Sequence, residues 1–435
     1  MILRAKRLLS NLQPSRGKGV FRTLLLLAAC AWLSACSNQA SHGGDKMTAE
    51  ARISLARQRY GSGQPVVLAA AWNSQDGEFL AGAQLAAEEI NAEGGINGHV
   101  LKLETLDEQP FVSGTAFTHF RDQGRYRNEP QLAGTTMAKT ILRNPEITAV
   151  IGHSTDSTIL PAMLAYEQSG VLFFGSGSND SRIRWSSAHL YFQLQPQNTL
   201  LAKVMTKRMK DWNWDKIYFI YEATRHNEQF VELLKTDCAS ANINFGGAVA
   251  IMPDASSNSS TMRMQQSIAA LRAGDVDALV LIASSDLAAH TIREARTLGL
   301  LQPFIIKLLS NPISFIKRVG PFGENARLVT LGRDGYQIDE FHKRFAARFP
   351  NQKADVSAEF GYDSVRLYAD AVATADSTDP TLVANVLHYK LTTWHGLLGN
   401  YTFVDREVQN VKYSVQRLVR QKDGELAFVK DSSVE

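Results

Sequence analysis

Short apolar runs alternate with helix-length segments along most of the chain, and this alternation constrains the fold more than any other feature. The runs carry almost no charge, as expected for strands that are buried on both faces of a sheet. A strand followed by a helix and another strand is the pattern of parallel sheets with helices on both faces. The clearest runs are PVVLAAAW at 65–72, ITAVIG at 147–152, GVLFFG at 170–175, KIYFIY at 216–221, DALVLIA at 277–283 and PFIIKLL at 303–309.

The sequence therefore predicts an α/β protein, and its length predicts more than one lobe. About 370 residues of this pattern exceed what one small sheet accommodates. The segment YFQLQPQN at 191–198 lacks helical periodicity and contains a proline between two complete units, so we expect the first crossing between lobes there.

The first 35 residues have the composition of a secretion signal peptide. Six basic residues and no acidic residue precede the apolar run LLLLAACAWLSA, which is too short to span a membrane comfortably. The run ends in LSAC, which resembles the lipobox of bacterial lipoproteins, whose cysteine is lipidated and becomes the first mature residue. The alternative is an ordinary cleavage site with an incidental cysteine.

Lipid on Cys36 would anchor the mature chain to the periplasmic face of a membrane or to the outer face of the plasma membrane. Ser37 rather than aspartate follows, which favours the outer membrane where the cell has one. Residues 36–64 are polar and are predicted to form a tether, so that the folded body begins at Pro65.

The charge of the mature chain argues against a nucleic-acid partner. Without the six basic residues of the signal, 40 of the 46 basic residues remain against 43 acidic ones, a net charge of −3. Such a chain has no basic field of the kind that neutralises phosphates.

The sequence contains no pattern typical of catalysis or of a cofactor. The stretch IGHSTDST at 151–158 does not match G-x-S-x-G, and no P-loop, dinucleotide fingerprint or H-E-x-x-H motif is present. Once Cys30 leaves with the signal and Cys36 carries lipid, Cys238 remains alone, which excludes an internal disulfide and a cysteine-based zinc site. We expect Cys238 to pack as a small apolar residue, and we predict no catalytic residue, no metal and no cofactor.

Five stretches resemble, in order and in spacing, the type I periplasmic solute-binding proteins of the branched-chain amino-acid and amide-binding family of ABC transporters. The stretches are GAQLAAEEINAEGGINGHVLKLETLDE at 82–108, AVIGHSTDSTILPAMLAYEQSGVLFFGSGSND at 149–180, IREARTLGL at 292–300, AEFGYDSVRLYADAV at 358–372 and DREVQNVKYSVQRLVRQKDGELAFV at 405–429.

The resemblance implies two αβα Rossmann-like lobes joined by a three-segment hinge, with a ligand cleft between them. The expected boundaries are 66–194 plus 333–405 for lobe 1, and 195–332 plus 406–435 for lobe 2. The fold class also places the ligand in this cleft, because pockets of open α/β sheets lie outside the carboxyl ends of the strands.

Hydroxyl groups follow the strand ITAVIG and make 151–158 a candidate ligand cup. Hydroxyls and free backbone N–H groups at a helix start hold a carboxylate or carbonyl oxygen. The alternative role for Ser157 or Thr158 is to cap the helix that follows. For His153 we favour a hydrogen-bonded role near the strand end.

The sequence departs from the family pattern at the positions that hold the ligand. The family's carboxylate-binding serine is replaced by Asp156 and its threonine by Asn179, while the position of the lobe 2 acid falls near Leu308. The usual tyrosine and glycine after the first strand of lobe 2 are His226 and Asn227. A carboxylate at Asp156 repels a carboxylate ligand, so we expect a ligand with a cationic, amide or polyol group facing it.

The predicted ligand contacts all lie at strand ends or in the loops after them. Trp72 is a candidate for stacking on a planar or apolar ligand, and its alternative role is in the core. The contacts predicted for lobe 1 are Trp72, Ser154, Asp156, Ser157, Gly177, Ser178 and Asn179, and those for lobe 2 are His226, Ser284, Ser285 and Asp286.

The resemblance implies a protein that captures a small polar solute, such as an amino-acid-like molecule, an amide, an amine or a polyol. Hinge closure would present the solute to an ABC transporter permease, without any catalysis. The alternative is a ligand-sensing or scaffolding envelope lipoprotein that regulates a membrane sensor or a cell-wall partner. The long connection at 110–127, with four aromatic residues and three arginines, suits either a partner-binding patch or a self-packed loop.

Overall fold

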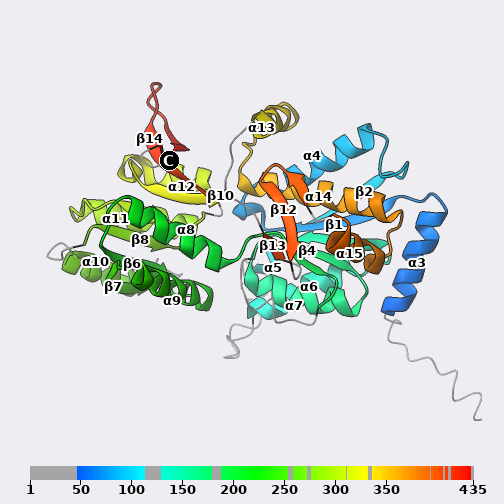
Figure 1. Ribbon diagram of the computed structural model, residues 1–435, viewed down its shortest axis with the longest axis horizontal. Coiled ribbons are helices and arrows are strands. Elements are labelled where there is room, and N and C mark those ends of the chain that lie inside the picture. Colours follow the sequence, from blue (N-terminus) through cyan, green and yellow to red (C-terminus); the bar gives the residue numbers. More distant parts are fainter. Residues whose placement is uncertain are drawn as a thin grey trace, which may run out of the picture. The chain divides into compact units, whose positions relative to one another are not determined.

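Two β-sheets with helices on both faces organise the protein, which confirms the predicted α/β class (Figure 1). We call the first sheet with its helices lobe 1, and the second sheet with its helices lobe 2. The computed structural model describes residues 47–112, 129–178, 188–252, 258–271, 276–309, 311–331, 336–391, 393–404, 407–409 and 413–432. The predicted signal peptide, Cys36 and most of the 110–127 connection lie outside these residues.

The sheet of lobe 1 has eight strands in the order β11-β12-β13-β5-β4-β3-β1-β2. The pairs among β1 to β5 and between β5 and β13 are parallel, and β12 pairs antiparallel with both β11 and β13. The strands are β1 (Val66–Trp72), β2 (Leu101–Asp107), β3 (Ile147–Gly152), β4 (Leu172–Gly175), β5 (Tyr191–Gln193), β11 (Trp394–Gly396), β12 (Gly399–Val404) and β13 (Glu407–Gln409).

The sheet of lobe 2 has seven strands in the order β15-β14-β10-β9-β8-β6-β7. Strands β6 to β10 pair in parallel, and β14 pairs antiparallel with β10 and with β15. The strands are β6 (Lys216–Glu222), β7 (Asn244–Ile251), β8 (Ala278–Ile282), β9 (Phe304–Ile306), β10 (Arg327–Leu331), β14 (Tyr413–Arg420) and β15 (Leu426–Lys430).

Helices follow most of the parallel strands, as the alternation in the sequence predicts. Those of lobe 1 are α3 (Ala49–Gly61), α4 (Phe79–Ala92), α5 (Gln109–Val112), α6 (Glu129–Ile141), α7 (Asp156–Gln168), α13 (Tyr336–Arg348), α14 (Val356–Ala375) and α15 (Pro380–Tyr389), with the short 3-10 helix η1 (Ser74–Asp76). Those of lobe 2 are α8 (Asn198–Asp211), α9 (Arg225–Ser240), α10 (Asn258–Leu271), α11 (Ser285–Thr297) and α12 (Pro312–Val319), with the 3-10 helix η4 (Gly320–Gly323).

Each sheet separates two hydrophobic cores, because successive side chains of a strand point to opposite faces. In β1, Leu68 packs with α4 and α14, whereas Val67 packs with α6 and α7 on the other face. In β8, Leu281 packs with α11 and α12, whereas Val280 packs with α8 and α9. Burial on both faces explains why these strands are continuous apolar runs in the sequence.

Helices α4 and α14 meet at two glycines. A methyl group on Gly82 would lie 2.6 Å from the carbonyl carbon of Ala358, and one on Gly361 would lie 2.9 Å from that of Phe79. Real side chains do not approach backbone atoms so closely, so both positions require glycine for the helices to pack at this separation.

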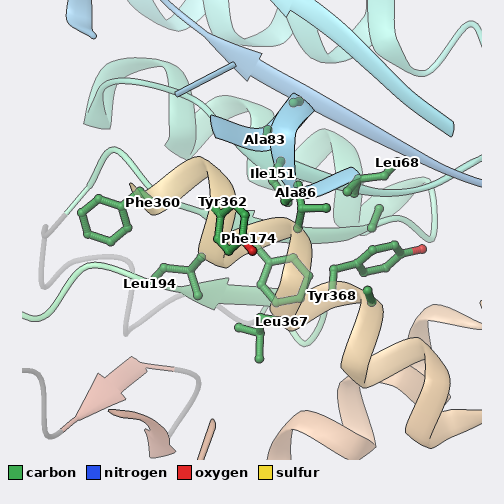
Figure 2. Packing of buried hydrophobic residues seen from close by; sticks show 14 of the residues in the cluster. Leu68, Ala83, Ala86, Ile151, Phe174, Leu194, Phe360, Tyr362, Leu367 and Tyr368 are labelled. Carbon is green, nitrogen blue, oxygen red and sulfur yellow. The ribbon is translucent and has the colours of Figure 1, made fainter. Parts of the chain in front are cut away.

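Aromatic residues fill the core beneath α14. The rings of Phe174 and Tyr368 pack edge to face with their centroids 6.3 Å apart (Figure 2). The Tyr368 hydroxyl lies 2.7 Å from the Thr148 hydroxyl, so this buried polar group has a hydrogen-bond partner. Burial raises the pKa of Tyr368, against the smaller opposite effect of that hydrogen bond.

The predicted tether at 36–64 requires a correction, because its second part is the helix α3, which packs on lobe 1. Arg52 of α3 is 3% exposed. Its guanidinium donates to the carbonyl oxygens of Leu142 and Asn144, both at 2.9 Å, just beyond the end of α6. Carbonyl groups at the end of a helix lack partners within that helix, so they accept hydrogen bonds from the Arg52 guanidinium. Apolar periodicity in the sequence does not reveal that a polar helix such as α3 docks in this way.

The chain changes sheet between β5 and β6, between β10 and β11, and between β13 and β14. The third change of sheet comes after Gln409, because β13 still belongs to the sheet of lobe 1. The predicted boundary at 405/406 is therefore too early. The antiparallel pair of β14 and β15 matches the strand alternation and turn expected for the C-terminal segment.

Candidate functional site

Strand ends from both sheets surround a cavity of about 170 Å³. This location is the one that open α/β sheets favour, because loops and helix starts converge at the carboxyl ends of parallel strands. The described lining residues are Trp72, Ser154, Gly177, Gln195, Val356, Ser357 and Phe360 from lobe 1, the crossing segment and α14, and Lys307, Leu308, Leu309 and Leu331 from lobe 2.

Trp72 is the last residue of β1 and belongs to both the core and the cavity. Its indole is 5% exposed and stacks on Phe79 with ring centroids 4.4 Å apart. The same residue contributes to the cavity lining. The two roles considered for it from the sequence are therefore compatible.

A buried ion pair fixes the turn after β3. The side chains of His153 and Glu108 are both 0% exposed, and Nδ1 of the imidazole contacts one carboxylate oxygen of Glu108. Ser154 donates to the other oxygen from its backbone N–H at 3.0 Å and from its hydroxyl at 2.8 Å. His153 Nε2 lies 2.9 Å from the hydroxyl of Tyr166. His153 is thus a hydrogen-bonded residue of the strand end, and Ser154 is held in place at the cavity wall.

The pKa of Glu108 reflects this pairing. Burial alone would raise the pKa, but the charge and hydrogen bond of His153 and the two hydrogen bonds from Ser154 outweigh it. The pKa of Glu108 is therefore held below its ordinary value.

Asp156 begins α7 and is the centre of a cluster that joins the lobes. Its carboxylate accepts a hydrogen bond from the Ser178 hydroxyl, and its second oxygen lies 2.8 Å from Nδ1 of His226 in lobe 2. His226 Nε2 in turn lies 3.1 Å from the ammonium nitrogen of Lys307. With Nδ1 as the donor to Asp156, Nε2 is free to accept from the ammonium. We call Asp156, Ser178, His226 and Lys307 the bridging cluster.

The bridging cluster neutralises the charge at Asp156. Burial would raise the pKa of this carboxyl, but His226, Ser178 and the charge of Lys307 outweigh burial and lower it. The negative charge of Asp156 is also favourable in the first turn of a helix. Asp156 therefore has its partners within the chain and needs no cationic group from a ligand.

Lys307 is a site residue that the sequence-based prediction misses. It follows β9, is 6% exposed, and its ammonium lies 4.4 Å from the centre of the Phe230 ring. Burial lowers its pKa to about 8, against the opposite effect of Asp156. The signal for it was a lysine inside the apolar run PFIIKLL, since lysine is rarely buried without a partner.

The remaining lobe 1 residues of the predicted site have different environments. Gly177 lines the cavity, and a methyl group on it would overlap the backbone of Ser154. Asn179 lies outside the described residues. Ser157 is exposed, and its hydroxyl lies 2.9 Å from that of Thr155. The expected capping by Ser157 or Thr158 is wrong, because α7 starts two residues earlier than expected and Thr155 is its N-cap residue.

The lobe 2 residues predicted at the start of α11 are engaged locally and are not among the described lining residues. The backbone N–H of Ser284 donates to a carboxylate oxygen of Glu222 at 2.9 Å, and Ser285 accepts from the backbone of Asn311 at 2.9 Å. Asp286 pairs with Arg318 at 2.8 Å on the surface.

The other lining residues come from segments that sequence reasoning did not associate with the site. Gln195 lies in the predicted crossing segment, whose position between lobes was a usable signal. Val356, Ser357 and Phe360 come from the start of α14, which reaches the cavity by tertiary packing alone.

Neither a metal-binding cluster nor a reactive thiol is found among the residues that the structure describes. No group of three or more His, Cys, Asp and Glu residues is placed to hold a metal ion within the described ranges. Cys238 is buried, and burial raises the pKa of its thiol to about 11. The thiol therefore stays protonated, which suits the packing role expected for it.

Two α/β lobes with a cavity at the strand ends define a solute-binding protein of the type I periplasmic fold, and comparison with known proteins agrees. The family model described as "Periplasmic binding protein" matches residues 126–424. The chain belongs to the periplasmic binding protein family. Its relatives and structural neighbours are solute-binding proteins rather than enzymes.

The chain resembles two proteins of Pseudomonas aeruginosa and several solved structures. It is 23% identical over 344 residues to the leucine-, isoleucine-, valine-, threonine-, and alanine-binding protein, covering 77% of this chain and 83% of that protein. It is 30% identical over 112 residues to an amino acid binding protein, but this match spans 26% of this chain and 25% of that protein. The crystal structure of an ABC transporter substrate-binding protein from Desulfitobacterium hafniense in complex with Leu has a TM-score of 0.67 at 19% identity, covering 84% of this chain and 100% of that chain.

Proposed function

We propose that the protein is a lipid-anchored, extracytoplasmic solute-binding protein that takes a small solute into its cavity and delivers it to an ABC importer. The observation that carries this proposal is the cavity, whose wall is built from strand ends of both lobes. A ligand that contacts both lobes stabilises the form in which they are close together, and a membrane partner recognises that form.

The size of the cavity supports a small ligand. Its volume of about 170 Å³ is below the roughly 300–1,000 Å³ of typical small-molecule pockets. The relatives named above bind leucine and other amino acids, which are small solutes of this kind.

A sensing or scaffolding lipoprotein is the second candidate, and the bridging cluster favours it. Asp156 of lobe 1 and His226 of lobe 2 connect the lobes through the protein's own side chains. A protein that holds itself shut through its own side chains would present a fixed surface to an envelope partner, such as a membrane sensor or a cell-wall enzyme.

A thermal-shift screen separates the two candidates. The library contains amino acids, amides, amines, polyols and small carboxylates, and the protein is the purified mature form. A solute that binds the folded state stabilises it by about 2.7 kcal/mol at a concentration one hundred times its Kd. We expect at least one class to raise the melting temperature in a dose-dependent way, whereas a scaffold would respond to none of them.

The lipid anchor is tested at the cysteine that ends the signal peptide. We expect Cys36→Ala to prevent lipidation and to shift the protein from the membrane fraction to the soluble envelope fraction or to block its processing. Within the described chain no helix combines the length and apolar character needed to cross a bilayer. Cys30→Ala is the matched control and should leave the protein in the membrane fraction. Equal membrane retention of both variants, with the signal peptide removed from both, would refute the anchor.

A further inference from the structure

The cavity has an uneven distribution of charge. Among the described residues that line it, Lys307 carries a charge and no carboxylate is present. Glu108 and Asp156 lie nearby, but each is engaged inside the protein. Glu108 accepts from His153 and Ser154, and Asp156 accepts from Ser178 and faces His226. Among the described residues, an incoming ammonium group would therefore meet a cation and find no available carboxylate.

The ammonium of Lys307 makes fewer hydrogen bonds within the protein than it has donor hydrogens. It has three donor hydrogens, and the contacts recorded for it are His226 Nε2 at 3.1 Å and the ring of Phe230 at 4.4 Å. With 6% of the residue exposed, little water replaces the missing partners. An anionic hydrogen-bond acceptor stabilises a buried cation in this position more than it would stabilise a cation at the surface.

The rest of the wall is suited to an apolar body. Large apolar side chains form most of the lining, and the polar ones are neutral. Ser154 donates its hydroxyl hydrogen to Glu108, which leaves its oxygen as an acceptor. The apolar lining residues are Trp72, Leu308, Leu309, Leu331, Val356 and Phe360.

We propose that the ligand is an organic monocarboxylate with a small apolar body and no ammonium group, and that its carboxylate pairs with Lys307. This inference rests on the proposed solute-binding function and specifies its ligand class. This ligand class differs from the cationic, amide or polyol ligand expected from the sequence. The difference arises because the structure places His226 and Lys307 beside the carboxylate of Asp156.

The first test compares ligands that share one apolar body. Isothermal titration at neutral pH uses isocaproate, isocaproamide, isohexylamine and leucine, which is isocaproate with an added α-ammonium group. Benzoate, benzamide and benzylamine form a second matched series. We expect the carboxylates to bind at least about tenfold more tightly than the amides and amines, because a charge-assisted hydrogen bond contributes more than a neutral one. Leucine should bind more weakly than isocaproate.

The second test removes the charge. Lys307→Met keeps an unbranched apolar side chain, and we expect it to weaken carboxylate binding by about one hundredfold, the upper range for a hydrogen bond to a charged group. Lys317→Met, at an exposed position of α12, is the matched control and should bind like the unaltered protein. Thermal unfolding of both variants verifies that they are folded.

A third measurement distinguishes direct pairing from a structural role of Lys307. Carboxylate affinity should fall by about tenfold per pH unit above about 8, as the ammonium loses its proton. The groups that face it are Asp156 from α7 and His226 from α9. In Lys307→Arg, which stays protonated, the alkaline fall should disappear.

The outcomes separate this inference from the proposed function. Amines, amides or polyols that bind as tightly as the carboxylates, or a Lys307→Met variant with full carboxylate affinity, would overturn the ligand class and leave solute binding intact. A protein that binds no member of either series and none of the screened solutes would overturn both.

Discussion

Replacement of Gly82 by alanine is expected to lower the free energy of unfolding by about 3 kcal/mol, near the upper end of typical overpacking costs. The new methyl group would lie 2.6 Å from the carbonyl carbon and 2.8 Å from the Cα of Ala358, so it would collide with backbone rather than with a movable side chain. Helices α4 and α14 would have to separate, and the core of lobe 1 beneath them would lose contacts. The shift of the urea unfolding midpoint measures the effect.

Gly61→Ala is the matched control for this substitution. Gly61 is the last residue of α3, and apart from the adjacent residues and the backbone of its own helix no described atom lies within 4 Å of the position that its methyl group would take. Alanine stabilises helices relative to glycine by up to about 1 kcal/mol, so Gly61→Ala should be neutral or stabilising. Equal midpoints for the two variants would contradict the close packing of α4 on α14.

Glu108→Gln is the second substitution with a large expected effect, a loss of about 3–5 kcal/mol in the free energy of unfolding, as for other broken buried ion pairs. Both oxygens of Glu108 act as acceptors, one for His153 and the other for the N–H and hydroxyl of Ser154. Glutamine replaces one of these oxygens with an NH₂ donor, so a buried donor of Ser154 or His153 loses its acceptor. Denaturant titration of the purified protein measures the loss.

The pH dependence of stability gives an independent measure of the same ion pair. The pKa of Glu108 is lower in the folded protein than its ordinary value of 4.5. As the pH falls, Glu108 therefore becomes protonated in the unfolded chain before it does in the folded protein. The stability that Glu108 contributes is fully present above its ordinary pKa and is lost as the pH falls through its lower pKa in the folded protein. In Glu108→Gln the free energy of unfolding should therefore fall less at acid pH than it does in the unaltered protein.

Glu340→Gln serves as the control for the loss of a surface ion pair. Glu340 pairs with Lys343 at 2.7 Å, but the lysine side chain is 72% exposed, and such pairs contribute little to stability. We expect no measurable change in this variant. A loss in Glu108→Gln no larger than that in Glu340→Gln would show that the buried pair does not stabilise the turn after β3.

The sequence locates part of the candidate site because the fold class places ligands at strand ends. Trp72 ends β1, Ser154 and Gly177 follow β3 and β4, and all three residues line the cavity. The same rule also selects Asp286, whose carboxylate pairs with Arg318 on the surface. A position at a strand end thus makes a residue a candidate for the site, but the direction of its side chain depends on neighbours that the local sequence does not specify.

The amino-acid sequence by itself determined the α/β class and the buried strands at the centre of each sheet, because burial on both faces of a parallel sheet requires continuous apolar runs. Only the tertiary structure decided that Lys307 meets His226 and Asp156, that α3 docks through Arg52, and that α4 and α14 touch at glycines. These contacts join residues that are distant in the chain and depend on charge, hydrogen bonds and close backbone approach. Local periodicity reports how each segment is buried, but it carries no information about which distant partner satisfies a buried charge.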